Sequence, residues 1–447
     1  MPFVAGVGTW RRIAGAAVTI LAFVVAAPAW ATPKIHHWTE GNGARVYFVE
    51  ARELPILQVN VVFDAGAARD PAGKSGLAMM TNALLEDGAG DLDADAIAQA
   101  LESLGAELSN DSQRDMAMLG LRTLSDTPLR SRALDVMARI LTAPSFPEDV
   151  LERERQRALV GLKQQQQSPG SLASKRFYEV LYRDHPYAAD PAGTERGLSA
   201  ITRDDLLAFH RRYYVGHNAV LAMIGDVSVG TARKIARALV GGLPAGEPPP
   251  PLPPVPAAQG PNGGVDRTVH PSSQSHIFLG EPVLTRDDPD YFPLYVGNHI
   301  LGGSGLVSRI SEEIREKRGL SYSAYSYFLP MRKPGPYIIG LQTRNDQRDQ
   351  ALKVLRETVA NFVEHGPTAQ ELEAAKKNIT GGFPLRIDSN RKIADYLAVI
   401  GFYQLPLSYL DDFIPKVEAV TVEQIRDAFQ RRVDPGRMVT VIVGGGR

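Results

Sequence analysis

The sequence predicts an α+β protein made of two homologous domains, each an antiparallel sheet with helices packed on one face. Three observations carry this prediction. The two halves of the chain share a series of apolar and charged patterns, a Pro-rich run separates them, and strand patterns precede helix patterns within the first half. Strands followed by helices in mixed order favour a layered α+β arrangement over a parallel α/β fold.

Length and composition agree with a globular protein of more than one domain. The chain has 447 residues, of which 44% are hydrophobic and 22% are charged. Its 49 Lys and Arg residues against 50 Asp and Glu give a net charge of -1, which does not favour a nucleic-acid binder. The sequence has no Cys, and this excludes disulfides, thiolate zinc sites, iron–sulfur clusters and Cys nucleophiles.

Residues 1–31 predict a secretory signal peptide. Arg11 and Arg12 precede an uncharged stretch, residues 13–31, that ends in Ala29-Trp30-Ala31. A positive start, an apolar middle and an Ala-x-Ala end are the parts of an export signal, with cleavage after the last Ala. The alternative is a retained anchor helix, because this uncharged stretch could nearly span a bilayer. The small residues at its end favour removal, so we expect a mature chain without a membrane span, exported to a bacterial periplasm.

A Pro-rich run at residues 246–256 divides the mature chain near its middle and is typical of an extended spacer. Patterns on either side of it match at nearly constant offsets. At offsets of 218 to 221 residues, the matching stretches are 133–137 with 351–355, 151–152 with 372–373, and 201–224 with 420–443. We therefore predict a duplicated domain. The predicted boundaries are 1–31 for the signal peptide, 32–242 for the N-terminal domain, 243–264 for the linker and 265–447 for the C-terminal domain.

The elements of the first half follow from local patterns. Residues 44–50 and 56–63 alternate like two strands of a hairpin or meander. Residues 76–85 predict a buried helix, and residues 93–104 an amphipathic helix capped by Asp93 or Asp95. The remaining predicted elements are strands at 107–110 and 116–121 and helices at 128–142 and 147–167.

Several motifs occur in a characteristic order. Gly76-Leu77-Ala78 leads into the first helix, and a His-Pro-Tyr-x-x-x-Pro-x-Gly segment runs from His185 to Gly193. The second half adds a Gly-rich stretch at residues 301–305, then Ser308-Arg309, then the run from Arg315 to Tyr322. With these motifs, essentially the whole mature chain resembles the pitrilysin/insulinase/mitochondrial processing peptidase family. The resemblance implies that the two domains form a clamshell around a chamber.

The zinc motif of active family members is degenerate in this chain. In those members the first helix carries His-x-x-Glu-His, whose two His bind zinc while the Glu activates a water molecule. Here the three positions hold Met79, Asn82 and Ala83, and the family's third ligand falls at Val160-Gly161. A thioether is a poor zinc ligand, a methyl group is none, and a carboxamide cannot take a proton from water. We therefore expect no metal and no cofactor in this chain.

The nine His residues offer no replacement site. None of them forms His-x-x-Glu-His, His-x-x-x-His or the inverted motif. His36 and His37 with Glu40 make the nearest cluster, but it lies in an extended stretch just after the predicted cleavage site, and we do not expect it to bind metal. We expect His185 to order a loop and His210 to lie on a helix.

Arg315 and Tyr322, seven residues apart, match the Arg/Tyr pair that the family carries in its C-terminal half. Residues 310–317 predict a helix stopped by a following Gly, and residues 320–328 alternate like a strand, so the two side chains lie on elements that can converge. An Arg fork can hold a substrate carbonyl, and a Tyr hydroxyl can donate to the oxyanion of a tetrahedral intermediate. Arg318 is the competing Arg, and we expect it to cap the helix or to face solvent.

The Gly-rich stretch has two interpretations. It is either a simple turn at a helix start, or a substrate-binding loop like that of the noncatalytic subunit of the mitochondrial enzyme. The residues in question are Gly302, Gly303, Ser304 and Gly305.

Loss of the zinc residues with retention of the Arg/Tyr pair has a specific meaning in this family, because some relatives divide the two between subunits. We therefore predict a noncatalytic subunit of a heteromeric periplasmic zinc peptidase, inactive alone, that supplies Arg315 and Tyr322 to a composite site. The implied partner is a homologous exported chain that carries the zinc, in a heterodimer or a larger assembly. The implied substrate is a peptide or an unfolded polypeptide, bound extended along a sheet edge.

Two alternatives belong to other functional classes. The first is a pseudopeptidase that binds peptides or supports an assembly without turnover. The second is an independently active metallopeptidase, which stoichiometric bound metal and chelator-sensitive activity would identify.

Overall fold

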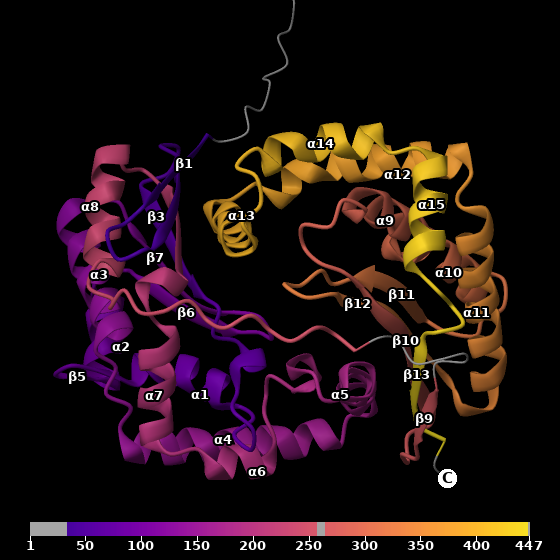
Figure 1. Cartoon of the computed structure of the whole chain (residues 1–447), viewed down its shortest axis with the longest axis horizontal. Helices are drawn as coiled ribbons and strands as arrows, with labels where there is room; N and C mark the ends of the chain where they lie inside the picture. Colours follow the sequence, from indigo (N-terminus) through magenta and orange to yellow (C-terminus); the bar gives the residue numbers. More distant parts are fainter. Residues whose placement is uncertain (1–33, 257–263, 446–447) are drawn as a thin grey trace, which may run out of the picture. The chain divides into compact units, whose positions relative to one another are not determined.

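Two β-sheets organise residues 34–256 and 264–445, the parts of the chain that the computed structural model describes (Figure 1). The predicted signal peptide lies outside these residues. The first sheet has the strand order β1-β2-β8-β3-β7-β6, the second has β11-β12-β10-β13-β9, and β4 pairs with β5. The strands are β1 Ile35–Thr39, β2 Arg45–Glu50, β3 Ile56–Phe63, β4 Gly88–Ala89, β5 Leu92–Asp93, β6 Glu107–Ser112, β7 Ala117–Leu124, β8 Ala219–Gly225, β9 Val265–Thr268, β10 Gln274–Leu284, β11 Ser323–Phe328, β12 Gly335–Arg344 and β13 Val439–Val443.

The two sheets repeat one topology, which confirms two homologous α+β domains. The series β2-β8-β3-β7-β6 of the first sheet corresponds to β9-β13-β10-β12-β11 of the second. The prediction of wholly antiparallel sheets is wrong in one respect, because β2 with β8 and β13 with β9 are parallel pairs. The predicted hairpin of residues 44–50 and 56–63 is also wrong, since β8 lies between β2 and β3. The chamber between the domains stays a prediction.

Helices follow the strands in both halves, and their starts are locally determined. The Asp93 carboxylate accepts the Ala96 N–H at 2.8 Å and caps α2. Thr202 and Thr421, at matching positions of the repeat, both close capping boxes. The helices are α1 Leu77–Ala83, α2 Ala94–Ser103, α3 Thr127–Thr142, α4 Glu148–Gln166, α5 Pro169–Tyr182, α6 Glu195–Ala200, α7 Arg203–Tyr213, α8 Val229–Val240, α9 Tyr291–Asn298, α10 Arg309–Ser311, α11 Arg348–His365, α12 Ala369–Gly382, α13 Asn390–Tyr403, α14 Tyr409–Ala419 and α15 Val422–Arg432.

One helix of each half packs against the sheet of the other half. Helix α13 packs against β2, β3 and β8, while α5 packs against β10 and β13. Both sheets are therefore covered on two faces, not on one as predicted. Two glycines permit the close approach: a Cβ at Gly401 of α13 would lie 2.4 Å from Val220, and one at Gly280 of β10 would lie 2.8 Å from Phe177 of α5.

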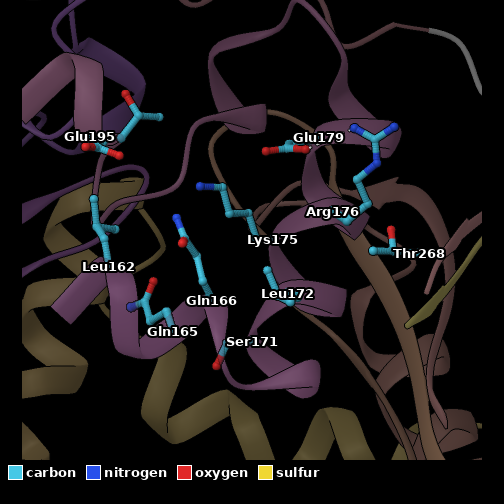
Figure 2. Close-up of a pocket in the computed structure, with 11 residues that line it drawn as sticks. Leu162, Gln165, Gln166, Ser171, Leu172, Lys175, Arg176, Glu179, Glu195 and Thr268 are labelled. Atoms are coloured by element: carbon cyan, nitrogen blue, oxygen red, sulfur yellow. Dashed lines mark hydrogen bonds and ion pairs between the residues drawn. The ribbon is translucent and has the colours of Figure 1, made fainter. Parts of the chain in front are cut away.

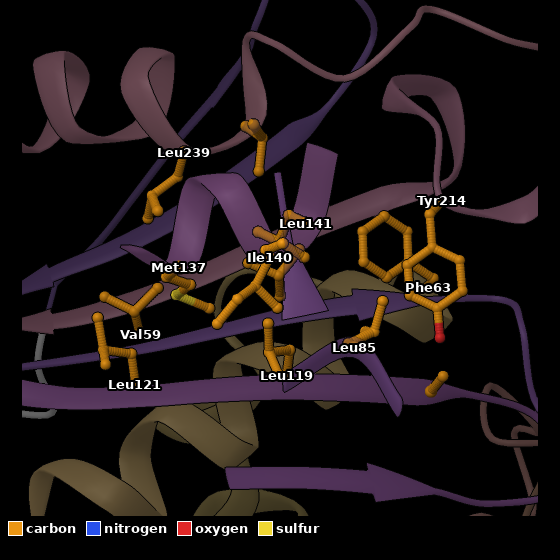
Figure 3. Packing of buried hydrophobic residues seen from close by; sticks show 14 of the residues in the cluster. Val59, Phe63, Leu85, Leu119, Leu121, Met137, Ile140, Leu141, Tyr214 and Leu239 are labelled. Atoms are coloured by element: carbon orange, nitrogen blue, oxygen red, sulfur yellow. The ribbon is translucent and has the colours of Figure 1, made fainter. Parts of the chain in front are cut away.

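Strand β8 shows the consequence of this double cover. All of its residues are buried, as its nearly continuous apolar sequence suggests. Leu221 and Met223 face the core of the first half, whereas Val220, Ala222 and Ile224 pack in the cluster that includes α13. In the first-half core, side chains of β3 and β7 meet those of α3 (Figure 3).

The Pro-rich linker is fastened to the first half. Residues 244–256 carry neither helix nor strand. Arg69 donates to the Pro250 carbonyl at 2.7 Å, and Arg212 to the Glu247 carbonyl at 3.0 Å. The predicted domain boundaries themselves stay predictions. Within the described chain, no helix is both long enough and apolar enough to cross a bilayer.

Candidate functional site

Helix α1 presents the degenerate zinc positions. Met79 and Ala83 lie four residues apart, and both are half-buried. A thioether and a methyl group offer zinc no adequate donor pair. Val160, where the third ligand would fall, is 54% exposed on α4. The residues present here do not fit the metal, and within residues 34–256 and 264–445 no three His, Cys, Asp or Glu side chains gather into a possible metal site.

Asn82, at the position of the family's Glu, is buried and links neighbouring elements by hydrogen bonds. Its amide nitrogen donates to the carbonyls of Asp111 and Met118 at 3.0 and 3.3 Å, and its amide oxygen accepts the Tyr214 hydroxyl at 3.2 Å. These bonds join α1 to strands β6 and β7. The Asp70 carboxylate accepts the first N–H groups of the helix. The motif alone did not reveal this network, because its partners lie far away in sequence.

Arg315 lies on a short helical segment that ends where the sequence predicts. Helix α10 runs into a π-helical turn, Glu312–Glu316. Gly319 has a φ of 61°, a conformation that Gly adopts easily, and its N–H donates to the Arg315 carbonyl at 2.9 Å. The Arg315 side chain is 36% exposed, and its Nε lies 3.4 Å from Oε1 of the adjacent Glu316.

The neighbouring cations are held more firmly. Lys317 Nζ and Arg318 Nη1 each lie 2.6 Å from a carboxylate oxygen of Glu313. The hydrogen bonds from Lys317 and then Arg318 lower the pKa of Glu313. Arg318 is thus a partly exposed side chain in a close ion pair. A ligand that binds Arg315 breaks a longer ion pair than one that binds Arg318, so binding to Arg315 costs less free energy.

Tyr322 points to solvent because the residues before it are anchored. The Leu320 carbonyl accepts the Thr343 hydroxyl at 2.5 Å, and the Ser321 hydroxyl donates to the Gln342 carbonyl at 2.6 Å. Tyr322 is 89% exposed. Strand β11 begins just after it, three residues later than predicted. The structure places Arg315 and Tyr322 on the surface of one helix–turn–strand unit, without a bond between them.

The Gly-rich stretch is partly a packing requirement. Gly302 and Gly303 end a π-helical turn after α9. A Cβ at Gly302 would lie 2.2 Å from the Ser326 hydroxyl, and one at Gly303 would lie 2.9 Å from the Asn298 amide. For these two glycines the geometry supports the turn interpretation.

Ser304 and Gly305 lie in a freer part of the stretch. Gly305 has a φ of 65° and open space at its Cβ. Leu306 and Val307 follow it with their side chains exposed. These exposed apolar residues were missed in the sequence, where they resemble ordinary core positions.

Edge strand β11 offers a second surface for an extended ligand. It ends the second sheet, as β6 ends the first (Figure 1). Tyr325 and Tyr327 lie on one face of the strand and stack with ring centres 6.0 Å apart, and both are exposed. Unpaired backbone groups of an edge strand can bind an extended peptide.

A cavity of about 250 Å³ lies between α4, α5 and α6 (Figure 2). Its lining includes side chains of both charges, among them Lys175, Glu179 and Glu195. Arg176 at its rim bonds Asp266 at 2.8 Å and Glu179 at 3.1 Å. None of the residues predicted for substrate binding lines this cavity.

Comparison with known proteins agrees with this geometry. A family model described as "Insulinase (Peptidase family M16)" matches residues 45–195, and one described as "Peptidase M16 inactive domain" matches residues 200–379. A crystal structure described as a peptidase M16 inactive domain from Pseudomonas fluorescens is 39% identical, with a TM-score of 0.89 over 92% of this chain and 98% of that chain.

More distant relatives also match this chain. The "Non-peptidase homolog YmxG" of Helicobacter pylori is 24% identical over 89% of this chain and 91% of its own. The crystal structure of the periplasmic protease PqqL from Escherichia coli shares the fold at 17% identity and a TM-score of 0.77, covering 92% of this chain and 46% of PqqL.

Proposed function

The chain belongs to the M16 peptidase family, and from that premise we propose that it is a noncatalytic subunit of a heteromeric periplasmic zinc peptidase. One contrast carries the proposal. The zinc positions hold Met79, Asn82 and Ala83, which cannot form the metal site, whereas Arg315 and Tyr322 remain accessible on the surface. The names of two relatives, an M16 inactive domain and a non-peptidase homolog, support loss of the hydrolytic centre.

The Arg/Tyr pair acts on the substrate. The Arg315 guanidinium, whose ion pair is with the adjacent Glu316, turns to a peptide carbonyl, and the Tyr322 hydroxyl donates to the oxygen that becomes negative in the transition state. A homologous partner chain supplies the zinc and the activated water. This chain contributes binding and charge stabilisation from the opposite side.

The substrate is a peptide or an unfolded polypeptide. In the described sheets, edge strands β6 and β11 each have one side without a neighbouring strand, where an extended chain can pair beside the carbonyl that Asn82 or Asn298 already occupies. Strand β11 also carries exposed tyrosines. The periplasm as the compartment rests on the export pattern of residues 1–31.

Reconstitution tests the roles of the pair. The chain is purified with a homologous exported chain that carries His-x-x-Glu-His, and hydrolysis of an unstructured peptide is measured. We expect Arg315→Ala and Tyr322→Phe each to lower kcat/KM by about 10²-fold, the usual cost of losing one such donor, in a complex that still assembles. Arg318→Ala, which removes the paired neighbour, serves as the control and leaves the rate nearly unchanged. Unchanged rates in both test variants refute the composite site.

A peptide-binding or scaffold pseudopeptidase is the second candidate. The exposed apolar side chains of Leu306, Val307 and Tyr322 favour it, because they provide a contact surface that needs no catalysis. Peptide affinity of the isolated chain, with no turnover in the presence of any zinc-motif partner, identifies this function.

A further inference from the structure

A second cavity, of about 220 Å³, borders the proposed peptide surface in the C-terminal half. Gly303 of the Gly-rich stretch and Tyr327 of edge strand β11 both line it. A chain paired to β11 therefore runs close to this cavity. Its volume suits one side chain or a chain end, not a folded partner.

Positive charge dominates the lining. Arg286 and Arg386 contribute to the wall, and no Asp or Glu does. The Arg286 Nε is buried without a hydrogen-bond partner, and within the described residues no acidic side chain forms an ion pair with this guanidinium. Its centre lies 5.7 Å from the Tyr291 ring and 6.0 Å from the Tyr403 ring. A partly desolvated Arg without a counter-ion is costly, and aromatic rings compensate only in part.

The carboxylates next to Arg286 in the chain have other partners. Asp287 accepts the Thr285 hydroxyl at 2.7 Å, and Asp288 accepts Arg432 at 3.0 Å. Arg386, the second Arg of the lining, lies 5.8 Å from the Tyr295 ring. The lining thus gives the positive charge of Arg286 no acidic partner.

The cavity occupies the counterpart of the zinc position in the internal repeat. Asn298 of α9 donates to the Ser326 carbonyl on β11 at 2.9 Å, just as Asn82 of α1 donates to the Asp111 carbonyl on β6. The matching positions are Met79 with Tyr295, Asn82 with Asn298, and Ala83 with His299. Burial, followed by the charge of Arg386, lowers the pKa of His299. The neutral imidazole then offers a hydrogen bond without adding charge.

We propose that this cavity binds the carboxylate of a peptide, with Arg286 and Arg386 as its counter-ions. The proposal rests on the proposed peptide-binding function and adds a specificity to it. A guanidinium matches the two oxygens of a carboxylate in a bidentate geometry. The carboxylate comes from an acidic side chain or from the C-terminus of the peptide, because both present the same pair of oxygens.

Calorimetric titration of the purified chain distinguishes the two sources. Three unstructured peptides of equal length are used: one rich in Gln with both ends blocked, one with every Gln replaced by Glu and both ends blocked, and one rich in Gln with a free C-terminal carboxylate. We expect one of the two carboxylate peptides to bind about ten- to a hundredfold more tightly than the neutral peptide, the range for a hydrogen bond to a charged group. The peptide that gains affinity identifies the source.

Variants assign the preference to the cavity. We expect Arg286→Gln and Arg386→Gln to abolish it while the Kd of the neutral peptide stays unchanged. Arg344→Gln is the matched control. It removes an exposed Arg at the C-terminal end of β12, whereas the cavity lies beside the N-terminal end of that strand. Arg386 is exposed, so its variant keeps the test valid if Arg286→Gln does not fold.

The outcomes separate the site from the function. Equal affinity for all three peptides, or a preference that survives both substitutions, refutes the carboxylate site and leaves peptide binding intact. Failure of every peptide to bind refutes peptide binding and the site with it.

Discussion

The Tyr403 hydroxyl donates a hydrogen bond to Asp115 Oδ2 at 3.1 Å and so joins α13 of the second half to the turn between β6 and β7 of the first. Asp115 is 4% exposed. Its carboxylate also accepts the Tyr187 hydroxyl at 2.5 Å and the Arg332 N–H at 2.8 Å. Burial raises the pKa of Asp115, and these donors oppose the rise. One buried carboxylate therefore connects three segments from both halves.

Removal of this acceptor should destabilise the fold strongly. Asp115→Ala leaves one buried and two half-buried donors without this acceptor, and we expect a loss of about 3 kcal/mol in the free energy of unfolding. Tyr403→Phe deletes one donor and should cost about 1–2 kcal/mol. Urea denaturation measures both, and the double variant should lose less than the sum because the residues are in contact. A loss within about 1 kcal/mol for Asp115→Ala would show that the junction is unimportant.

The Arg309–Glu371 pair should stabilise the C-terminal half above acidic pH. Arg309 holds the carboxylate by two bonds of 2.6 and 2.7 Å. Burial opposes ionisation of Glu371, but the bonds from Arg309 and Thr368 outweigh it and lower the pKa to about 2. A lowered pKa contributes stability that is present above the ordinary value of 4.5 and is lost as the pH falls towards 2.

Glu371→Gln should therefore reduce the dependence of the free energy of unfolding on pH in this range. Because the site is partly exposed, we expect a difference of only about 1 kcal/mol between wild type and variant at pH 6, disappearing near pH 2. Urea denaturation at several pH values measures it. Parallel stability curves for the two proteins would contradict the assignment.

Ionisation of Glu281 should destabilise the fold, in contrast to ionisation of Glu371. Burial on β10 raises its pKa to about 8, although the Asp434 N–H donates to it at 2.7 Å. A raised pKa contributes stability that is complete below the ordinary value of 4.5 and is lost as the pH rises through 8. Glu281→Gln keeps an acceptor without the charge, so relative to wild type it should gain about 4 kcal/mol between pH 5 and pH 9. An identical effect of the substitution at both pH values would exclude this titration.

Local chemistry made much of the fold predictable. The strand at residues 56–63 and the helix capped by Asp93 agree with β3 and α2, because alternation and capping depend on neighbouring residues. The parallel pairing of β2 with β8 and the exchange of α5 and α13 were not predictable in this way. Their partners are distant in sequence, and the apolar faces of β8 do not say which helix covers them.

The candidate site shows the same division. Short motifs located Met79, Asn82 and Ala83, and they also placed Arg315 and Tyr322 on adjoining elements. The hydrogen bonds made by Asn82 and the cavity at Arg286 depend on contacts between segments far apart in the chain. Sequence patterns do not carry that information.

The central claim is that hydrolysis requires this chain together with a homologous zinc-motif chain. The most direct measurement titrates this chain into a fixed amount of such a partner and follows cleavage of an unstructured peptide. The account predicts no cleavage by this chain alone and a rate that rises to a plateau at a fixed ratio of the two chains. Chelator-sensitive cleavage by the isolated chain, with one zinc bound per molecule, would contradict it.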